Sequence, residues 1–206
     1  GARPNFLHLY GFPATACISV NDTVIHGIPN RQQQIRPGDI VSIDTGCKID
    51  GFNGDNACTY GCGKLDLEAQ RLLDVTRESL HRGIAMALAG NRIGDVGHAV
   101  QAYVEENGFS VVRSFVGHGV GKELHEDPEV PNYGTPGRGQ RLVPGMCIAI
   151  EPMVCQHKYA VKTLKDGWTV KTVDGGLAAH FEHTVAITTA GAEILTHGWE
   201  EPGWTL

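Results

Sequence analysis

The sequence lacks the features of a membrane or secreted protein. No apolar run approaches the roughly 18 residues of a membrane-spanning helix, and the N-terminal stretch has no secretory signal pattern. The six cysteines form no C-x-x-C pair, and most lie in apolar, strand-like stretches, which favours reduced thiols over a disulfide framework. We therefore expect a cytoplasmic protein without a membrane partner.

The sequence also lacks an excess of basic residues. Lys and Arg number 17 against 23 Asp and Glu, which gives a formal net charge of −6. A general nucleic-acid or membrane-surface binder would usually present a basic face. The composition argues against both classes and agrees better with acidic residues gathered around metal ions.

Low-complexity linkers and internal repeats are absent as well, so we expect residues 1–206 to form a single domain. The chain begins with Gly1 rather than Met, and we expect a leading segment to be missing from it. Glycine makes up 27 of 206 residues, nearly twice the usual ~7%. With no low-complexity segment to contain them, these glycines are expected at particular backbone positions.

The pattern of apolar residues predicts an α+β fold with mostly antiparallel sheet. Two short strands are expected around an Asn21-Asp22 turn, and a longer hairpin around Asp50-Gly51. One helix is predicted from an N-cap at Asp66 to Gly90, and a second over 95–106. Six strand-like runs follow, at 109–115, 146–154, 159–164, 168–173, 181–188 and 192–197.

The predicted long hairpin brings two aspartates together. If Asp50-Gly51 is a two-residue turn, Asp44 pairs with Ala57, and Asp55 becomes its diagonal neighbour at about 7–8 Å. Two buried carboxylates would repel unless they share a cation. A hairpin with two solvated aspartates is the alternative, although an unpaired charge in the apolar strand before Asp44 would be costly.

Three further residues have the character of metal ligands. His118 lies between two glycines, which allow the backbone to approach a site closely. Glu151 and Glu182 each occur at the end of an apolar strand. With a neutral histidine, the four acids carry about −4, which two divalent cations would neutralise. An oxygen-rich site with one imidazole suits Mn, Fe(II), Co or Zn, and such a pair of ions typically supports hydrolysis.

These residues occur in motifs that closely resemble the type I methionine aminopeptidases, from GFPATACISVN to AEILT. The matching motifs are IHGIP, SIDTG, FNGD, FVGHGVGKELHEDPEVPNY, AIEPM and FEHT. The resemblance implies the pita-bread fold, in which two similar halves enclose a metal site. It also implies a monomeric catalytic domain that removes the initiator methionine from nascent proteins and prefers a small second residue.

The resemblance further implies roles for individual residues. The five metal ligands would be Asp44, Asp55, His118, Glu151 and Glu182, with Asp55 and Glu182 bridging two ions. Glu151 would also accept the proton of the attacking water. His26 would lie beside the scissile amide, and His125 would contact the substrate backbone and stabilise the tetrahedral intermediate.

The resemblance also implies which residues form the methionine pocket and its rim. The pocket positions are Phe12, Cys17, Leu124 and Trp168, together with Leu9; for Cys17 and Leu124, ordinary core packing is nearly as good an interpretation. Tyr10 departs from the common bacterial pattern, in which a histidine is frequent. His180 and His183 flank Glu182, and we interpret them as packing or supporting residues rather than ligands.

A basic hairpin stands out in this acidic chain. It carries Lys158, Lys162, Lys165 and Lys171, and a solvated hairpin is the simplest interpretation. The alternative is a contact with ribosomal RNA, since phosphate contacts need only a local density of lysine. Two other functions stay open: an X-Pro peptidase of the same fold, and a non-catalytic peptide- or protein-binding module.

Overall fold

The computed structural model describes residues 1–198. The helices are α1 (Leu67–Met86), α2 (Ile93–Glu106) and a 3-10 turn at Leu9–Gly11. The first eight strands are β1 (Arg3–Pro4), β2 (Cys17–Val20), β3 (Thr23–Ile25), β4 (Ile40–Ile49), β5 (Phe52–Gly61), β6 (Ser110–Val111), β7 (Gly117–Gly119) and β8 (Glu126–Val130). The remaining strands are β9 (Cys147–Ile150), β10 (Met153–Cys155), β11 (Val161–Thr163), β12 (Val170–Thr172), β13 (Ala178–His180), β14 (His183–Ile187) and β15 (Ala192–Ile194).

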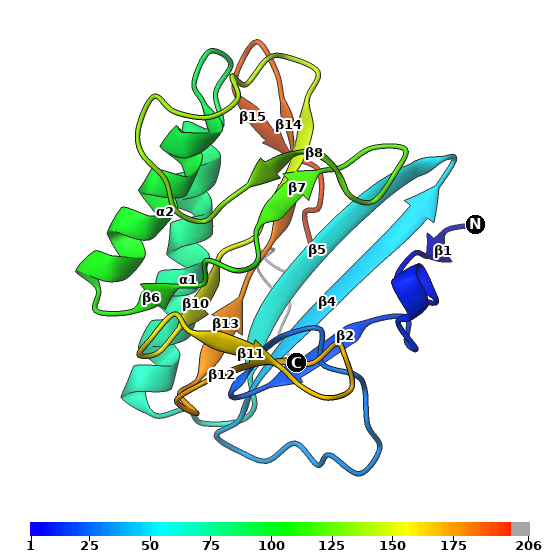
Figure 1. Ribbon diagram of the computed structural model, residues 1–206, viewed down its shortest axis with the longest axis vertical. Helices are drawn as coiled ribbons and strands as arrows, with labels where there is room; N and C mark the ends of the chain where they lie inside the picture. The colour runs from blue at the N-terminus through cyan, green and yellow to red at the C-terminus, as the bar shows by residue number, and fades with distance from the viewer. Residues whose placement is uncertain (199–206) are drawn as a thin grey trace.

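The strands pair only in antiparallel fashion among the described residues, which confirms the predicted α+β class. One sheet has the order β1-β4-β2, with β5 also paired to β4, and another has the order β15-β14-β9-β7-β8. Two smaller sheets are β13-β10-β6 and β11-β12-β3. In Figure 1 the two helices lie side by side along one flank, and the β4–β5 hairpin runs along the other. The main core lies between the helices and the sheets.

The β4–β5 hairpin has the predicted register. Ile49 pairs with Phe52 and Asp44 with Ala57, and Asp50 and Gly51 both have positive φ (50° and 88°), as a tight hairpin turn requires. The ten-residue strands on each side fix which face every side chain points to. Asp44 and Asp55 therefore share one face of the hairpin.

Helix α1 begins as predicted and ends earlier. The Asp66 carboxylate accepts a hydrogen bond of 2.7 Å from the backbone N–H of Ala69, which caps the first turn. The predicted end at Gly90 is wrong, since the helix stops at Met86. There the Asn91 amide donates to the Met86 carbonyl at 2.9 Å and satisfies it without another helical turn. Helix α2 begins two residues before the predicted start and ends at Glu106 as predicted.

The later strand-like runs form shorter strands than their sequences predict. The run 146–154 divides into β9 and β10 at Glu151-Pro152, because proline has no N–H to donate to a ladder. The run 181–188 begins its strand only at His183. Strands β1, β7, β8 and β13 and the 3-10 turn were not predicted.

No helix within the described residues has the length and apolar character needed to cross a membrane. The single domain over 1–206 stays a prediction, since 199–206 lie outside the described residues.

Candidate metal centre and substrate cavity

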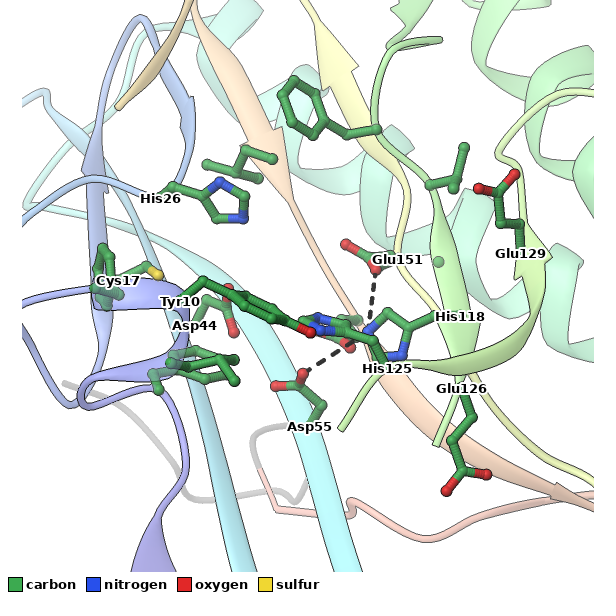
Figure 2. Close-up of a pocket in the computed structure, with 18 of the residues that line it drawn as sticks. Tyr10, Cys17, His26, Asp44, Asp55, His118, His125, Glu126, Glu129 and Glu151 are labelled. Carbon is green, nitrogen blue, oxygen red and sulfur yellow. Dashed lines mark ion pairs between the residues drawn. The ribbon is translucent and has the colours of Figure 1, made fainter. Parts of the chain in front are cut away.

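A cavity of about 590 Å³ brings most of the predicted site residues together. The predicted residues in its wall are Leu9, Phe12, Cys17, His26, Asp44, Asp55, His118, His125, Glu151, Trp168 and Glu182. Leu124 is not in the wall; it lies behind it, buried in an apolar cluster with Phe6, Phe12 and Cys17. Figure 2 shows the polar side chains entering the cavity from opposite sides.

Strand β5 meets the start of β14 at the cavity through one backbone bond and the polar side chains of Asn56 and Thr184. The Glu182 backbone N–H donates to the Ala57 carbonyl at 2.8 Å, and the Asn56 amide donates to the Glu182 carbonyl at 2.6 Å. Thr184 Oγ1 donates to the Asp55 carbonyl at 2.8 Å and accepts from the Asp55 N–H at 3.1 Å. These bonds place Asp55 of β5 against Glu182, which directly precedes β14.

His118 is aimed at the carboxylates by its flanking glycines. A Cβ at Gly117 would meet the Ala149 carbonyl, and one at Gly119 would meet the Asp127 carbonyl, so β7 could not lie this close to its neighbours with other residues. Nε2 of His118 lies 3.9 Å from Oδ2 of Asp55. Its distance to Oε1 of Glu151 is 3.7 Å.

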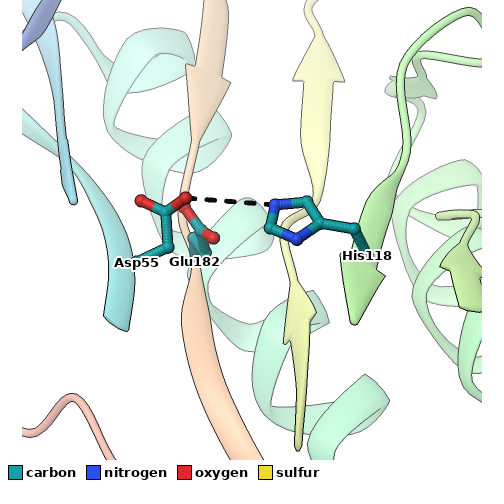
Figure 3. Close-up of side chains that lie close together, drawn as sticks. All are labelled: Asp55, His118 and Glu182. Atoms are coloured by element: carbon teal, nitrogen blue, oxygen red, sulfur yellow. Dashed lines mark ion pairs between the residues drawn. The ribbon is translucent and has the colours of Figure 1, made fainter. Parts of the chain in front are cut away.

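Asp55, His118 and Glu182 form a cluster of candidate ligand atoms. One ligand atom from each of the three lies within 4.8 Å of the others, and each comes from a different part of the chain (Figure 3). Among the described residues, buried Oδ1 of Asp44 and Oε1 of Glu182 have no hydrogen-bond partner. Buried polar atoms are nearly always satisfied, so these oxygens indicate that a ligand belongs between them.

The electrostatics of the carboxylates agree with bound cations. Burial, and next the charge of Glu151, raise the pKa of Asp55 to about 7. Burial raises the pKa of Glu151 to about 7 as well, against a smaller lowering by His118. Burial and the neighbouring carboxylates raise the pKa values of Asp44 and Glu182 well above their ordinary range. Four crowded acids with one imidazole fit divalent ions, which would offset this repulsion.

The two other predicted histidines are neutral. Burial lowers the pKa of His26 to about 4, and its ring lies edge-on to Phe115 and Trp168 at 5.8 and 6.4 Å between centroids. Burial also lowers the pKa of His125, whose ring meets that of His118 edge-on at 4.4 Å. Both imidazoles can therefore present one N–H donor and one lone pair to a substrate.

The predicted pocket residues other than Leu124 lie together in the wall of the cavity. Phe12 and Trp168 meet edge-on at 5.2 Å between ring centroids. Cys17 lies opposite Asp44 across the β2–β4 pair, and burial raises the pKa of its thiol, so the group stays protonated. These residues both pack together and face the cavity, so the two interpretations of Cys17 are compatible.

Several cavity residues were not predicted as site residues. They are Phe6, Tyr10, Ile25, Phe115, Val116, Gly117, Glu126, Asp127 and Glu129. Val116 lies two residues before His118, so strand alternation could have found it. Tyr10 has a positive φ of 50°, and its ring stacks on that of His125 at 6.2 Å, across the cavity in Figure 2. This placement depends on tertiary contacts that a sequence does not show.

The basic hairpin is partly paired within the protein. Lys162 lies opposite Lys171 in the β11–β12 pair. Nζ of Lys171 contacts both carboxylate oxygens of Asp22, at 2.8 and 3.0 Å, whereas Lys158, Lys162 and Lys165 are exposed. Three of the four lysines are thus open to solvent.

Comparison with known proteins places the chain among metal-dependent peptidases. A model of metallopeptidase family M24 matches residues 4–189. A methionine aminopeptidase of Clostridium perfringens is 57% identical over 95% of this chain and 78% of its own length. Methionine aminopeptidase 1 of Bacillus subtilis is 53% identical, over 95% and 79%.

Solved structures give the same result for the fold. The crystal structure of a methionine aminopeptidase from Thermotoga maritima has a TM-score of 0.94 and 50% identity, covering 96% of this chain and 79% of that one. A prolidase from Pyrococcus furiosus has a TM-score of 0.72 and 25% identity, over 89% and 49%. These neighbours share the pita-bread fold, which confirms the predicted architecture.

Proposed function

The chain belongs to metallopeptidase family M24, as a methionine aminopeptidase, and we propose that it uses two divalent ions to release the initiator methionine from nascent proteins with a small second residue. The observation that carries the proposal is the convergence of four acids and His118 on one cavity. Asp55 and Glu182 are buried, Asp44 and Glu151 are half-buried, and two of the carboxylate oxygens have no hydrogen-bond partner among the described residues.

Five residues would hold the ions: Asp44, Asp55, His118, Glu151 and Glu182. Bound divalent ions supply Lewis acidity toward a peptide carbonyl and make a water molecule more acidic. Cobalt, manganese, iron(II) and zinc all suit this set of donors. The raised pKa values of the carboxylates favour ions over an empty, charged cluster.

The protein side chains would orient the substrate and move the proton. The Glu151 carboxylate would accept the proton of the attacking water, since it lines the same cavity as the other proposed ligands. His26 lies beside the scissile amide, and His125 contacts the substrate backbone through the neutral imidazole. The methionine side chain packs against the wall formed by Phe12, Cys17 and Trp168, with Leu9 beside them and Leu124 behind. Its thioether sulfur is attracted to the aromatic rings of that wall.

The test measures free methionine released from a Met-Ala-Ser peptide by metal-stripped protein, before and after adding Co, Mn or Fe(II). Release that depends on the ion supports the proposal, and its absence with every ion overturns it. An Ala-Pro dipeptide is assayed in parallel, because preferential cleavage there would establish the X-Pro peptidase alternative. Release of methionine also excludes a non-catalytic binding module.

The setting of the reaction is part of the same proposal. We place the protein in the cytoplasm as a monomer, where nascent chains emerge from ribosomes. The exposed Lys158, Lys162 and Lys165, with Lys171 beside Asp22, would contact ribosomal RNA. Replacing all four lysines by Glu should reduce co-sedimentation with ribosomes, and unchanged co-sedimentation would contradict the contact.

A further inference from the structure

The two carboxylate oxygens of Glu151 face two different imidazoles. Oε1 lies 3.7 Å from Nε2 of His118, which is one of the proposed ligands. Oε2 lies 3.3 Å from Nε2 of His180, which is not. The carboxylate is thus bracketed between two rings, and only one of these contacts is explained by metal binding.

His180 is held in place by its backbone. It ends β13, is 2% exposed, and donates its N–H to Oγ1 of Thr59 at 2.9 Å. The same hydroxyl donates to the His180 carbonyl at 2.8 Å and lies 2.8 Å from the Ser42 hydroxyl. These bonds fix β13 to β5, so the ring is presented to Glu151 from a rigid position.

The contact with Glu151 accounts for a buried polar atom. Among the described residues, Nε2 of His180 makes no regular hydrogen bond, and Oε2 of Glu151 lies 3.3 Å from it. The imidazole of His180 can carry its proton on Nε2, the nitrogen that faces Glu151. A small rotation of the carboxylate or the ring would align that N–H with Oε2.

We propose that His180 is a positioning residue for Glu151: its Nε2–H donates to Oε2 and keeps Oε1 turned toward His118 and the metal centre. The inference rests on the proposed function, since it assigns Glu151 to that centre. Partners that orient a ligating carboxylate typically change metal affinity or activity 10–100-fold when removed. A role in packing alone would have no such effect.

Two substitutions of similar size separate these roles. Gln and Met have nearly the same length and flexibility, but only Gln can donate an N–H to Oε2. We expect His180→Met to weaken binding of Mn²⁺ to the stripped protein by about 10–100-fold and to lower kcat on Met-Ala-Ser similarly, with KM within about threefold. His180→Gln should restore most of both. His98→Met, on an exposed site of α2, is the control and should behave as the unchanged protein.

The measurements are calorimetric titration with Mn²⁺, steady-state kinetics, and circular dichroism to confirm folding. Equal affinities and kcat values for the Met and Gln variants would overturn the proposal, whether both are normal or both are low. If the Met variant does not fold, His180→Leu replaces it in the comparison with Gln. Absence of metal-dependent methionine release by the unchanged protein would overturn the proposed function, while the Mn²⁺ affinities of the two variants would still test the positioning role.

Discussion

The two halves of the site hold their acids in different ways. The hairpin half carries Asp44 and Asp55 inside two long, continuous strands. The other half places Glu151 and Glu182 at interruptions, between β9 and β10 and between β13 and β14. The first pair is positioned by a local ladder, and the second pair by contacts from elsewhere in the chain.

Those contacts come largely from polar side chains. Asn132 donates its amide to the Glu151 carbonyl at 2.8 Å, and Asn56 donates to that of Glu182 at 2.6 Å. The comparison teaches that a strand ladder can position a pair of ligands by itself, whereas ligands at strand ends need dedicated hydrogen bonds.

The largest effect should come from removing one acid from each half. Asp55→Ala and Glu182→Ala should each lower kcat/KM on Met-Ala-Ser by about three orders of magnitude or more, because a lost ion removes several kcal/mol of transition-state stabilisation. Glu193→Ala, exposed on β15, is the control. A large loss of kcat/KM in only one of the two variants would contradict the view that both acids serve one centre.

The stability of the stripped protein should depend on pH through the same acids. Glu151 has a folded pKa of about 7 against an ordinary 4.5, so the folded state holds its proton over a range where the unfolded chain does not. The acid therefore destabilises the fold increasingly as pH rises from about 4.5 to 7. The buried neutral histidines act in the opposite direction, and comparison with a variant cancels them.

Thermal unfolding of stripped Glu151→Gln and of the unchanged protein measures this difference. The variant should melt several degrees higher at about pH 7.5, at roughly 2–4 °C per kcal/mol, and the difference should shrink toward about pH 5. Asp55→Asn, in the hairpin half, should also raise the melting temperature at about pH 7.5, since the folded pKa of Asp55 is about 7 as well. A difference that grows toward acid pH would contradict both assignments.

A smaller effect is expected at the contact between the halves. Asn56→Ala removes the hydrogen bond to Glu182, together with a 3.2 Å contact to Nδ1 of His183. The free energy of unfolding should fall by about 1–3 kcal/mol, and Mn²⁺ affinity should fall with it. Denaturant unfolding and calorimetry measure the two. The control is Asn30→Ala, in an exposed loop, which should change neither the free energy of unfolding nor that of Mn²⁺ binding by more than about 0.5 kcal/mol. If Asn56→Ala leaves the stability unchanged, other contacts hold the two halves together.

The smallest effect is expected at the hairpin turn. Gly51→Ala places a Cβ at φ 88° and should cost about 1–2 kcal/mol, seen as a lower Tm. The register should survive, because the ladder extends over ten residue pairs, so kcat should be unchanged. Gly51→Asn, which tolerates this conformation, should recover part of the Tm. A fall in kcat would show that the turn, rather than the ladder, positions the aspartates.

The sequence was most informative where structure is local. The turn residues Asp50 and Gly51 set the register of the hairpin. Counting residues back from the turn then places Asp44 and Asp55 on the same face. The start of α1 followed from Asp66 in the same way. Flanking glycines singled out His118, and the ends of apolar strands singled out Glu151 and Glu182. The roles of His26 and His125 came from the motif resemblance alone.

Features that depend on distant contacts could not be predicted. Strand β13 has only three residues and is defined by pairing with β10, so its sequence carries little period of its own. Tyr10 reaches the cavity through a left-handed backbone conformation, next to a ring that follows it by more than a hundred residues. Such placements are set by packing, which dominates over local preference.

The absence of a backbone ladder between β5 and β14 among the described pairings has a consequence for how this site can change. A ladder would allow the two strands to shift only in steps that turn every side chain to the other face. Here one backbone bond, from the Glu182 N–H to the Ala57 carbonyl, and the side chains of Asn56 and Thr184 hold the two segments together. A substitution at Asn56 or Thr184 therefore alters the contacts between Asp55 and Glu182 while the pairing of β5 with β4 and of β14 with β9 stays in place.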